Sequence, residues 1–204
     1  MYGYFGYLEG VEPIKWGLNP VAAPASEPIT LSEAKVHCRV DISDDDTIIG
    51  TCITSARQYI ENILGRRLFT QTWDLILDRF PAGVHEMRCP WGPWQSITYI
   101  HYIDLSGNVA TMAASDYNLD SYSFEPRIYL SFSKIYPVPR PIQNAVTIRH
   151  VSGATSVNEN LKSAVKMRTK HLYDEARGVL DPFKLEKTKS AFDSIMAQER
   201  QSWL

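Results

Sequence analysis

The chain has 204 residues, of which 44% are hydrophobic and 22% charged, ordinary values for a soluble globular protein with a substantial core. Its formal net charge of −2 argues against a free DNA-binding protein, which normally presents a basic face. Three cysteines without a C-x-x-C pair argue against a disulfide framework and favour folding in a reducing cytoplasm. The sequence shows neither a signal-peptide pattern nor an apolar run near the roughly 20 residues that span a bilayer, so we expect no membrane association.

Residues 1–28 are rich in glycine, proline and aromatic side chains, so we expect an extended N-terminal arm here. Disordered segments are usually poor in aromatic residues, which indicates that this arm lies on a protein surface. That surface belongs either to a partner or to the arm's own domain, and the sequence leaves both open. The aromatic residues expected to make the contact are Tyr4, Phe5, Tyr7 and Trp16.

Two helices are predicted next, over residues 31–38 and 43–65. Thr30 or Ser32 can cap the first helix, and Glu33 stands three positions after Thr30, as in a capping box. Apolar residues recur at helical spacing through the second helix, and its last residue, a glycine, suits a C-terminal end.

The stretch DISDDDTI at residues 41–48 places four carboxylates at the start of the second helix. A calcium loop is excluded, because the positions that need a glycine and a bidentate glutamate hold Asp46 and Cys52. The same residues suit a helix N-terminus, with Ser43 or Asp44 as the cap and with Asp45 and Asp46 in the first turn. We therefore interpret the acidic cluster as structural.

Residues 70–152 contain short runs of β-prone residues separated by turn signals, which predicts an antiparallel, β-rich insertion. Gly107 and Asn108 suit the tip of a hairpin. The loop PWGPW presents Trp91 and Trp94, which belong either to an interface or to the core of the β region.

A second long helix is predicted over residues 156–176, and Lys162, Lys166 and Lys170 form one stripe along it. The stripe is either a solvated helix face or a surface that faces DNA phosphates. Residues 179–204 are predicted to form a helical tail. Its apolar residues are too few for a core helix, so we expect it to face a partner.

No set of catalytic, cofactor-binding or metal-binding residues stands out in the sequence. The five histidines lack zinc spacing, and the Walker, G-x-S-x-G and dinucleotide-binding motifs are missing. A hydrolase that uses His101 with Asp104 or Asp116 is the least supported hypothesis. We therefore expect neither an enzyme nor a cofactor.

Several motifs follow one another in an order typical of one protein family. ITLSEAKVHCRV precedes the acidic cluster, the long helix ends in Gly-Arg, and TQTWDLILDRFP, QSITYIHYIDLSGN and LKSAVKMRTKHLYDEARG follow. Through these motifs, residues 29–178 resemble the head–tail connector (adaptor) proteins of long-tailed bacteriophages. The resemblance implies an α+β fold in which a small helical bundle carries the antiparallel β-rich insertion, flanked by the arm and the tail.

The same resemblance implies a structural virion protein that is synthesised in the host cytoplasm and resides in the neck, at the head–tail interface. Its copies would form a ring, expected to be a dodecamer, that binds the portal protein and the stopper or tail proteins. Genomic DNA would pass through the channel of the ring without sequence recognition. Related connectors dock their C-terminal tails into the portal, which would assign this role to Phe183, Leu185, Phe192, Ile195, Met196 and Trp203.

The chain departs from the family pattern in its second long helix, which is usually strongly apolar but here contains Lys166, Arg168 and Lys170. The alternative hypothesis uses this feature: a non-specific DNA-binding or packaging-associated module would bind phosphates through Lys162, Lys166 and Lys170.

Overall fold

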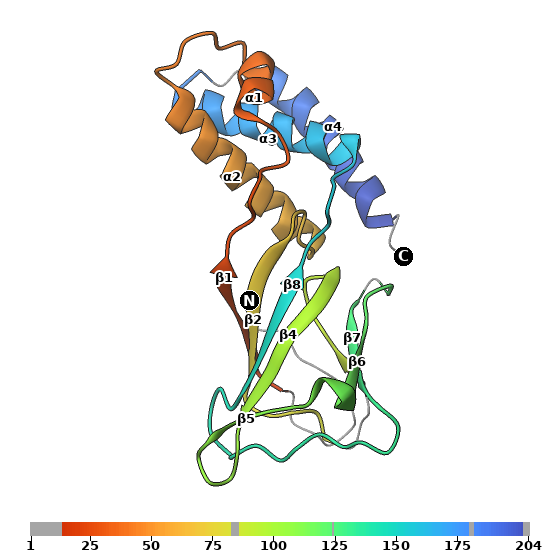
Figure 1. Ribbon diagram of the computed structural model, residues 1–204. Helices are drawn as coiled ribbons and strands as arrows, with labels where there is room; N and C mark the ends of the chain where they lie inside the picture. Colours follow the sequence, from red (N-terminus) through yellow and green to blue (C-terminus); the bar gives the residue numbers. More distant parts are fainter. Residues whose placement is uncertain (1–13, 83–85, 124, 180–181, 202–204) are drawn as a thin grey trace. The chain divides into compact units, whose positions relative to one another are not determined.

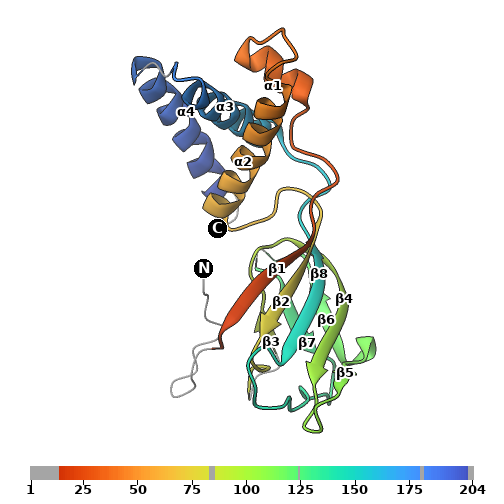
Figure 2. The same cartoon turned by 90° about the vertical axis from the view of Figure 1, so that its left-hand side faces the viewer.

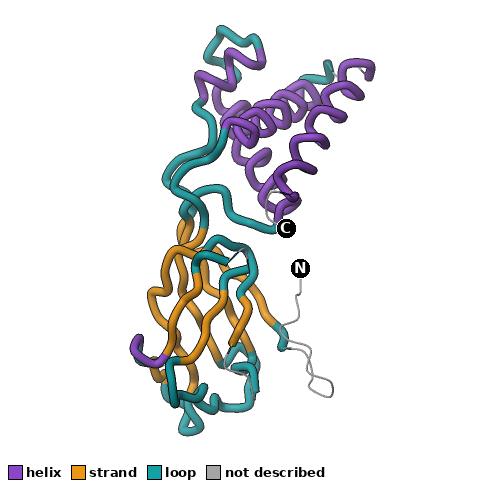
Figure 3. Tube along the Cα trace, turned by 90° about the vertical axis from the view of Figure 1, so that its right-hand side faces the viewer, coloured by secondary structure: helices purple, strands orange, loops and turns teal. Residues whose placement is uncertain are grey.

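The computed structural model describes residues 14–82, 86–123, 125–179 and 182–201. It confirms the predicted α+β class, with four α-helices and two antiparallel sheets in the described residues (Figure 1). The chain divides into two compact units, a β unit within residues 1–24 and 70–153 and a helical unit within residues 25–69 and 154–204. Helices and strands are almost fully segregated between these units (Figure 3).

The helical unit contains α1 (Leu31–Cys38), α2 (Asp46–Leu64), α3 (Glu159–Ala176) and α4 (Pro182–Gln201). The capping box predicted at the start of α1 is present: Glu33 N–H donates to Thr30 Oγ1 at 3.2 Å, and Thr30 N–H donates to Glu33 Oε2 at 2.8 Å. Gly65 ends α2 with φ 64°, a left-handed conformation that favours glycine. The second and third helices each begin three residues later than predicted, at Asp46 and Glu159.

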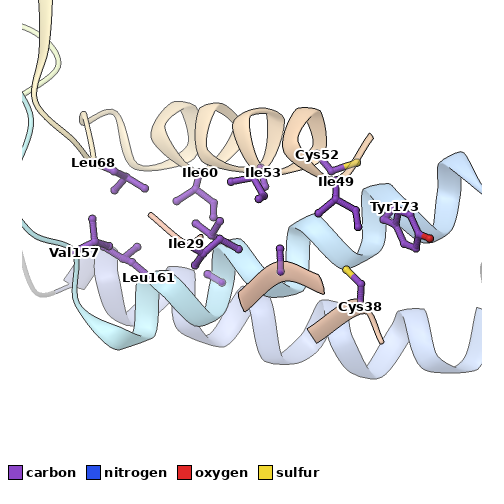
Figure 4. Close-up of a cluster of buried hydrophobic side chains, with 14 of the residues drawn as sticks. Ile29, Cys38, Ile49, Cys52, Ile53, Ile60, Leu68, Val157, Leu161 and Tyr173 are labelled. Carbon is purple, nitrogen blue, oxygen red and sulfur yellow. The ribbon is translucent and has the colours of Figure 1, made fainter. Parts of the chain in front are cut away.

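The core of the helical unit is built by the apolar face of α2 against α1 and α3. Ile49, Ile53 and Ile60 of α2 are almost fully buried and lie opposite Leu161 and other side chains of α3 (Figure 4). Burying a side chain of this size stabilises a fold by about 1.5–3 kcal/mol, so this face of α2 contributes strongly to the stability of the unit.

The C-terminal helix α4 packs on this core, contrary to the prediction of a wholly partner-facing tail. Met196 is only 4% exposed, and Phe192 and Ile195 pack beside it. The three residues are spaced i, i+3, i+4, so a short apolar stripe is enough to hold a mainly polar helix. The side chains of Phe183, Leu185 and Trp203, also assigned to portal docking, lie outside the described residues.

The β unit contains a five-stranded sheet with the order β1-β2-β8-β4-β5 and a three-stranded sheet with the order β3-β7-β6 (Figures 1 and 2). All pairings are antiparallel, as predicted. The strands are β1 (Trp16–Ala22), β2 (Gln71–Leu77), β3 (Glu86–Arg88), β4 (Trp94–Ile103), β5 (Val109–Thr111), β6 (Tyr117–Asp120), β7 (Arg127–Leu130) and β8 (Val146–Ser152), with a 3-10 turn at Ala114–Asp116.

Residues 16–22, expected within the extended arm, form the edge strand β1 of the β unit. Of the two surfaces left open for the arm, these residues therefore lie on that of their own chain. Pro20 is compatible with this position, because an edge strand leaves one row of backbone N–H groups without ladder partners. The paired strand β2 supplies the apolar and β-branched surface that the glycine- and proline-rich segment lacks.

Both sheets contribute to one apolar core in the β unit, and β8 shows the alternation expected of a strand with one buried face. Trp16 is 9% exposed and Trp94 is 1% exposed, and both belong to this core, which is one of the two alternatives that the sequence leaves open for them. Trp94 stacks on His150 with 3.6 Å between ring centroids. Trp91 is half-buried against the same core, whereas Tyr4, Phe5 and Tyr7 lie outside the described residues.

Candidate interaction surfaces

The side chain of Asp45, in the acidic cluster, forms hydrogen bonds with α3 and makes no capping hydrogen bond to its own helix. Tyr173 Oη donates to Asp45 Oδ2 at 2.6 Å, and Arg177 Nη1 donates to both carboxylate oxygens at 3.0 and 3.1 Å. The hydrogen bond to Asp45 raises the pKa of Tyr173. Asp45 itself occupies the N-cap position of α2, so the prediction of Ser43 or Asp44 as the cap is wrong.

The neighbouring carboxylate of Asp46 contacts α1, because Lys35 Nζ donates to its Oδ1 at 2.6 Å. Two consecutive aspartates therefore connect the start of α2 to α1 and to α3. The cluster is structural, as the sequence predicts, but it acts through contacts between helices more than through capping.

The lysine stripe of α3 is neutralised by carboxylates. The ion pairs are Lys162–Glu159 at 2.7 Å, Lys166–Glu33 at 3.1 Å and Lys170–Asp174 at 3.0 Å. Hydrogen bonds from the Thr30 backbone and from Lys166 lower the pKa of Glu33 from 4.5 to about 2. The structure thus uses these lysines within the helical unit, and together with their partners they carry little excess positive charge.

Buried charges hold the end of α4 to the rest of the helical unit. Arg66 Nη2 donates to Glu199 Oε2 at 2.8 Å, and the two side chains are only 7% and 6% exposed. Asn158 Nδ2 donates to the other carboxylate oxygen of Glu199 at 2.8 Å. Removing one partner of such a pair would leave a charge buried without compensation, which is strongly destabilising. Sequence reasoning missed this contact, although Glu199 continues the 192, 195, 196 stripe at i+7.

A second buried charge cluster surrounds Glu61, which is fully buried on α2. Arg57 and Arg67 donate to Glu61 Oε2 at 3.1 and 3.3 Å, and the backbone N–H of Leu68 donates to Oε1 at 3.0 Å. Arg57 also donates to Glu27 at 2.7 Å. These contacts hold two segments against α2: the one before α1, which contains Glu27, and the one after α2, which contains Arg67 and Leu68.

One end of the β unit exposes many large apolar side chains. The β4–β5 hairpin and the long loop between β7 and β8 lie together at this end (Figure 1), and Arg140 N–H of the loop donates to Ile103 O at 2.8 Å. The hairpin tip forms at Gly107 and Asn108 as predicted, with Gly107 at φ 91°. The exposed side chains at the hairpin and in this loop are Leu105, Val109, Phe132, Ile135, Val138 and Ile142.

Scattered apolar residues are normal on a protein surface, but a concentration of this kind marks an interaction surface. Beside it lies a groove of about 640 Å³ that is lined by residues 78–82, by Leu130 and by residues 135–142. The groove contains four prolines and only a few charged groups, so it fits an apolar or aromatic protein segment.

The residues of the hydrolase hypothesis are each held in structural contacts. His101 stacks on Tyr99 with 3.8 Å between ring centroids, and Asp104 accepts the Asn108 N–H at 2.9 Å in the hairpin. Lys134 lies 2.7 Å from Asp116 and lowers the pKa of that carboxyl group.

Within the described ranges, no group of three or more histidine, cysteine, aspartate or glutamate residues could hold a metal ion. None of the helices in the described ranges has the length and apolar character that a transmembrane segment needs.

Part of the chain matches a known protein family, and the fold is similar to that of several solved structures. The family model of phage gp6-like head-tail connector proteins matches residues 28–88, which contain α1, α2, β2 and β3. The resemblance to head–tail connector proteins is confirmed. A search of curated proteins with this chain finds no significant match.

The fold of this connector-like chain is shared with proteins from gene transfer agent particles. A chain in the neck of the empty particle, computed with C6 symmetry, has a TM-score of 0.72 and 19% identity over 90% of this chain and 95% of that chain. A chain in the neck of the native particle, computed with C12 symmetry, has a TM-score of 0.63 and 21% identity over 78% and 83%. A chain in the native virion has a TM-score of 0.66 and 22% identity over 77% and 84%.

Proposed function

We propose that this chain is a non-enzymatic structural subunit of a phage-type neck, located between the head and the tail of the particle. The observation that carries the proposal is the shared fold with the neck chain of the empty gene transfer agent particle, which extends over 90% of this chain and 95% of that chain. The connector family match over residues 28–88 supports the same function independently of that fold comparison.

In the assembled neck, the copies form a ring of twelve that surrounds a DNA channel. The related necks are described with C12 and with C6 symmetry, and a twelve-membered ring is compatible with both because six divides twelve. DNA passes through such a ring without being read. Net charge supports this role, since a chain of charge −2 provides no bulk attraction that would hold the DNA in place.

The ring contacts the portal protein on one side and stopper or tail proteins on the other. Exposed apolar side chains on both units support an assembly role: Val36 on α1 is 77% exposed, and Val138 in the β unit is 72% exposed. The portal contact involves the C-terminal segment that contains Phe183, Leu185 and Trp203, while Phe192, Ile195 and Met196 anchor α4 to its own unit.

The ion pairs of α3 do not favour the DNA-binding alternative. Lysines that bind DNA contact its phosphates and release the counterions condensed on the DNA. Lys162, Lys166 and Lys170 instead contact carboxylates of their own chain.

The test is deletion of the gene in the genome that encodes this chain, followed by electron microscopy and mass spectrometry of the particles. The proposal predicts filled or empty heads that lack tails, with tail assembly restored by the chain supplied in trans. Normal tailed particles from the deletion, or wild-type particles without this protein, would contradict the proposal.

A further inference from the structure

A pocket lies between α2, α3 and α4 in the helical unit. It has a volume of about 310 Å³, and Tyr59 and Phe192 form its aromatic part with 6.1 Å between ring centroids. Arg168 of α3 also lines the pocket, and its guanidinium carbon lies 4.2 Å from the centroid of the Tyr59 ring. Among the described residues, the Arg168 side chain has no hydrogen-bond or ion-pair partner, and its Nε is buried. The pocket therefore contains a cation that no described carboxylate contacts.

Arg168 differs in this respect from the lysine stripe of the same helix, whose three members each pair with a carboxylate of their own chain. Arg168 contacts the face of an aromatic ring, and this contact uses none of the N–H donors of the guanidinium group. Lys189 and Asp193 of α4 complete the charged lining, and neither forms an ion pair within the described ranges. With two cations and one carboxylate, the lining favours an anionic ligand, and arginine binds carboxylates through two parallel hydrogen bonds.

The connection between α1 and α2 carries exposed carboxylates. Asp45 and Asp46 are engaged by α3 and α1. The side chains of Asp41 and Asp44, in contrast, are exposed and have no hydrogen-bond or ion-pair partner in the part of the chain that the structure describes. Ile42 lies between these two aspartates in the sequence and is 56% exposed. A segment with two unpaired carboxylates and an exposed aliphatic side chain complements a pocket with two cations and two aromatic rings.

The segment and the pocket lie on different sides of the helical unit. Helix α1 packs on α2 and α3, and α4 packs on the same two helices from the other side (Figure 2). The α1–α2 connection belongs to the α1 side, whereas α4 completes the pocket. A contact between two unlike surfaces of a subunit repeats head to tail, and it closes into a ring when the rotation between neighbours allows. This is the kind of contact that the proposed ring needs.

We propose that residues 41–44 of one subunit occupy the pocket of the neighbouring copy in the ring. The two aspartates of the segment pair with Arg168 and Lys189, and its isoleucine packs on the aromatic rings. Arg39, which is exposed at the end of α1, provides a cation for Asp193 of the pocket. This inference rests on the proposed ring and names the contact that joins its neighbouring copies.

Charge reversal in the full chain tests the contact, with each variant supplied in trans to the gene deletion. The segment variant carries Asp41→Lys and Asp44→Lys, and the pocket variant carries Arg168→Glu and Lys189→Glu. Each variant places like charges across the contact, so we expect about tenfold fewer tailed particles. The two variants combined in one chain restore opposite charges, and the number of tailed particles should return to about the wild-type level.

The matched control combines the segment variant with Lys162→Glu and Lys170→Glu, two reversals on α3 outside the pocket, and should restore nothing. Full assembly by either variant alone, or a combination that fails to restore assembly, would overturn the contact. If deletion abolishes tails while both variants assemble normally, the contact is wrong and the neck function stands. Tails that form after deletion would instead contradict the neck function itself.

Disulfide trapping in assembled particles is a second measurement that does not depend on charge. The three native cysteines are buried, so Ile42→Cys and Lys189→Cys in one chain can be oxidised selectively. A head-to-tail contact links each chain to two neighbours, and we expect a ladder of dimers, trimers and longer products on a non-reducing gel. The control, Ile42→Cys with Lys162→Cys, should give no ladder. Products that stop at the dimer, cross-links within single chains only, or no products at all would overturn the contact.

Discussion

The hydrogen bonds of Asp45 give a direct test of how the helical unit is held together. Asp45→Ala removes the acceptor of the Tyr173 hydroxyl, at 2.6 Å, and the partner of Arg177, at 3.0 Å. A hydrogen bond to a charged group contributes about 1.5–3 kcal/mol, and a pair with a half-exposed arginine contributes about 0.2–1 kcal/mol. The expected loss in the free energy of unfolding is therefore about 2–4 kcal/mol.

The assay is urea unfolding followed by circular dichroism at a helical wavelength, since Asp45 and both partners belong to the helical unit. Asp44→Ala is the matched control, because Asp44 is exposed and also stands at the start of α2; it should change stability by less than about 0.5 kcal/mol.

A double-mutant cycle with Tyr173→Phe separates the direct interaction from other effects of the substitution. The two residues are in contact, so we expect a coupling energy of about 1–3 kcal/mol. A coupling energy near zero, or equal effects of Asp45→Ala and Asp44→Ala, would refute the assignment of Asp45 as the connection between α2 and α3.

Three further predictions concern single positions. The pKa of Glu33 is lowered from 4.5 to about 2, so the ionised carboxylate stabilises the fold above pH 4.5 and this stabilisation is lost as pH falls toward 2. In thermal unfolding, Glu33→Gln should lower the free energy of unfolding by about 0.5–1 kcal/mol at pH 7 and leave it unchanged at pH 2. A loss that does not depend on pH would contradict this. Met196→Ala should cost about 2–4 kcal/mol and increase amide exchange in α4, whereas unchanged protection would mean that this residue does not anchor the helix. Alanine in place of Lys162, Lys166 and Lys170 together should leave any weak, salt-dependent DNA binding unchanged in a fluorescence anisotropy titration; a large loss would restore the DNA-binding alternative.

Local signals in the sequence predict much of the fold. The capping box of Thr30 and Glu33, the end of α2 at Gly65 and the hairpin tip at Gly107 each depend on a few neighbouring residues whose conformational preferences are strong. The alternation in residues 146–152 likewise needs only one buried sheet face.

Contacts between segments that are distant in the sequence cannot be predicted from such local patterns. Asp45 and Tyr173 are separated by 128 positions, so the acidic cluster gives no local sign that it binds another helix. The strand at residues 16–22 exists because β2 pairs with it, and its own glycine and proline residues indicate only an extended chain. The stripe of α4 is short, and its burial depends on the surface that α2 and α3 provide.

The candidate surfaces likewise depend partly on local sequence and partly on contacts between distant segments. Trp94 follows Pro93 in the loop PWGPW, a pattern that fits an interface as well as a core, and only the packing of Trp94 against His150 decides between the two. The family resemblance, in contrast, depends on the order of several motifs, and for this reason it indicates the assembly role that single residues do not.

The most direct measurement of the central claim is a cryo-electron microscopy reconstruction of the neck of particles that contain this chain. Our account predicts twelve copies in one ring between portal and tail, each with the helical and β units described here. A neck in which this fold is missing, or particles that carry the chain at another location, would contradict the account.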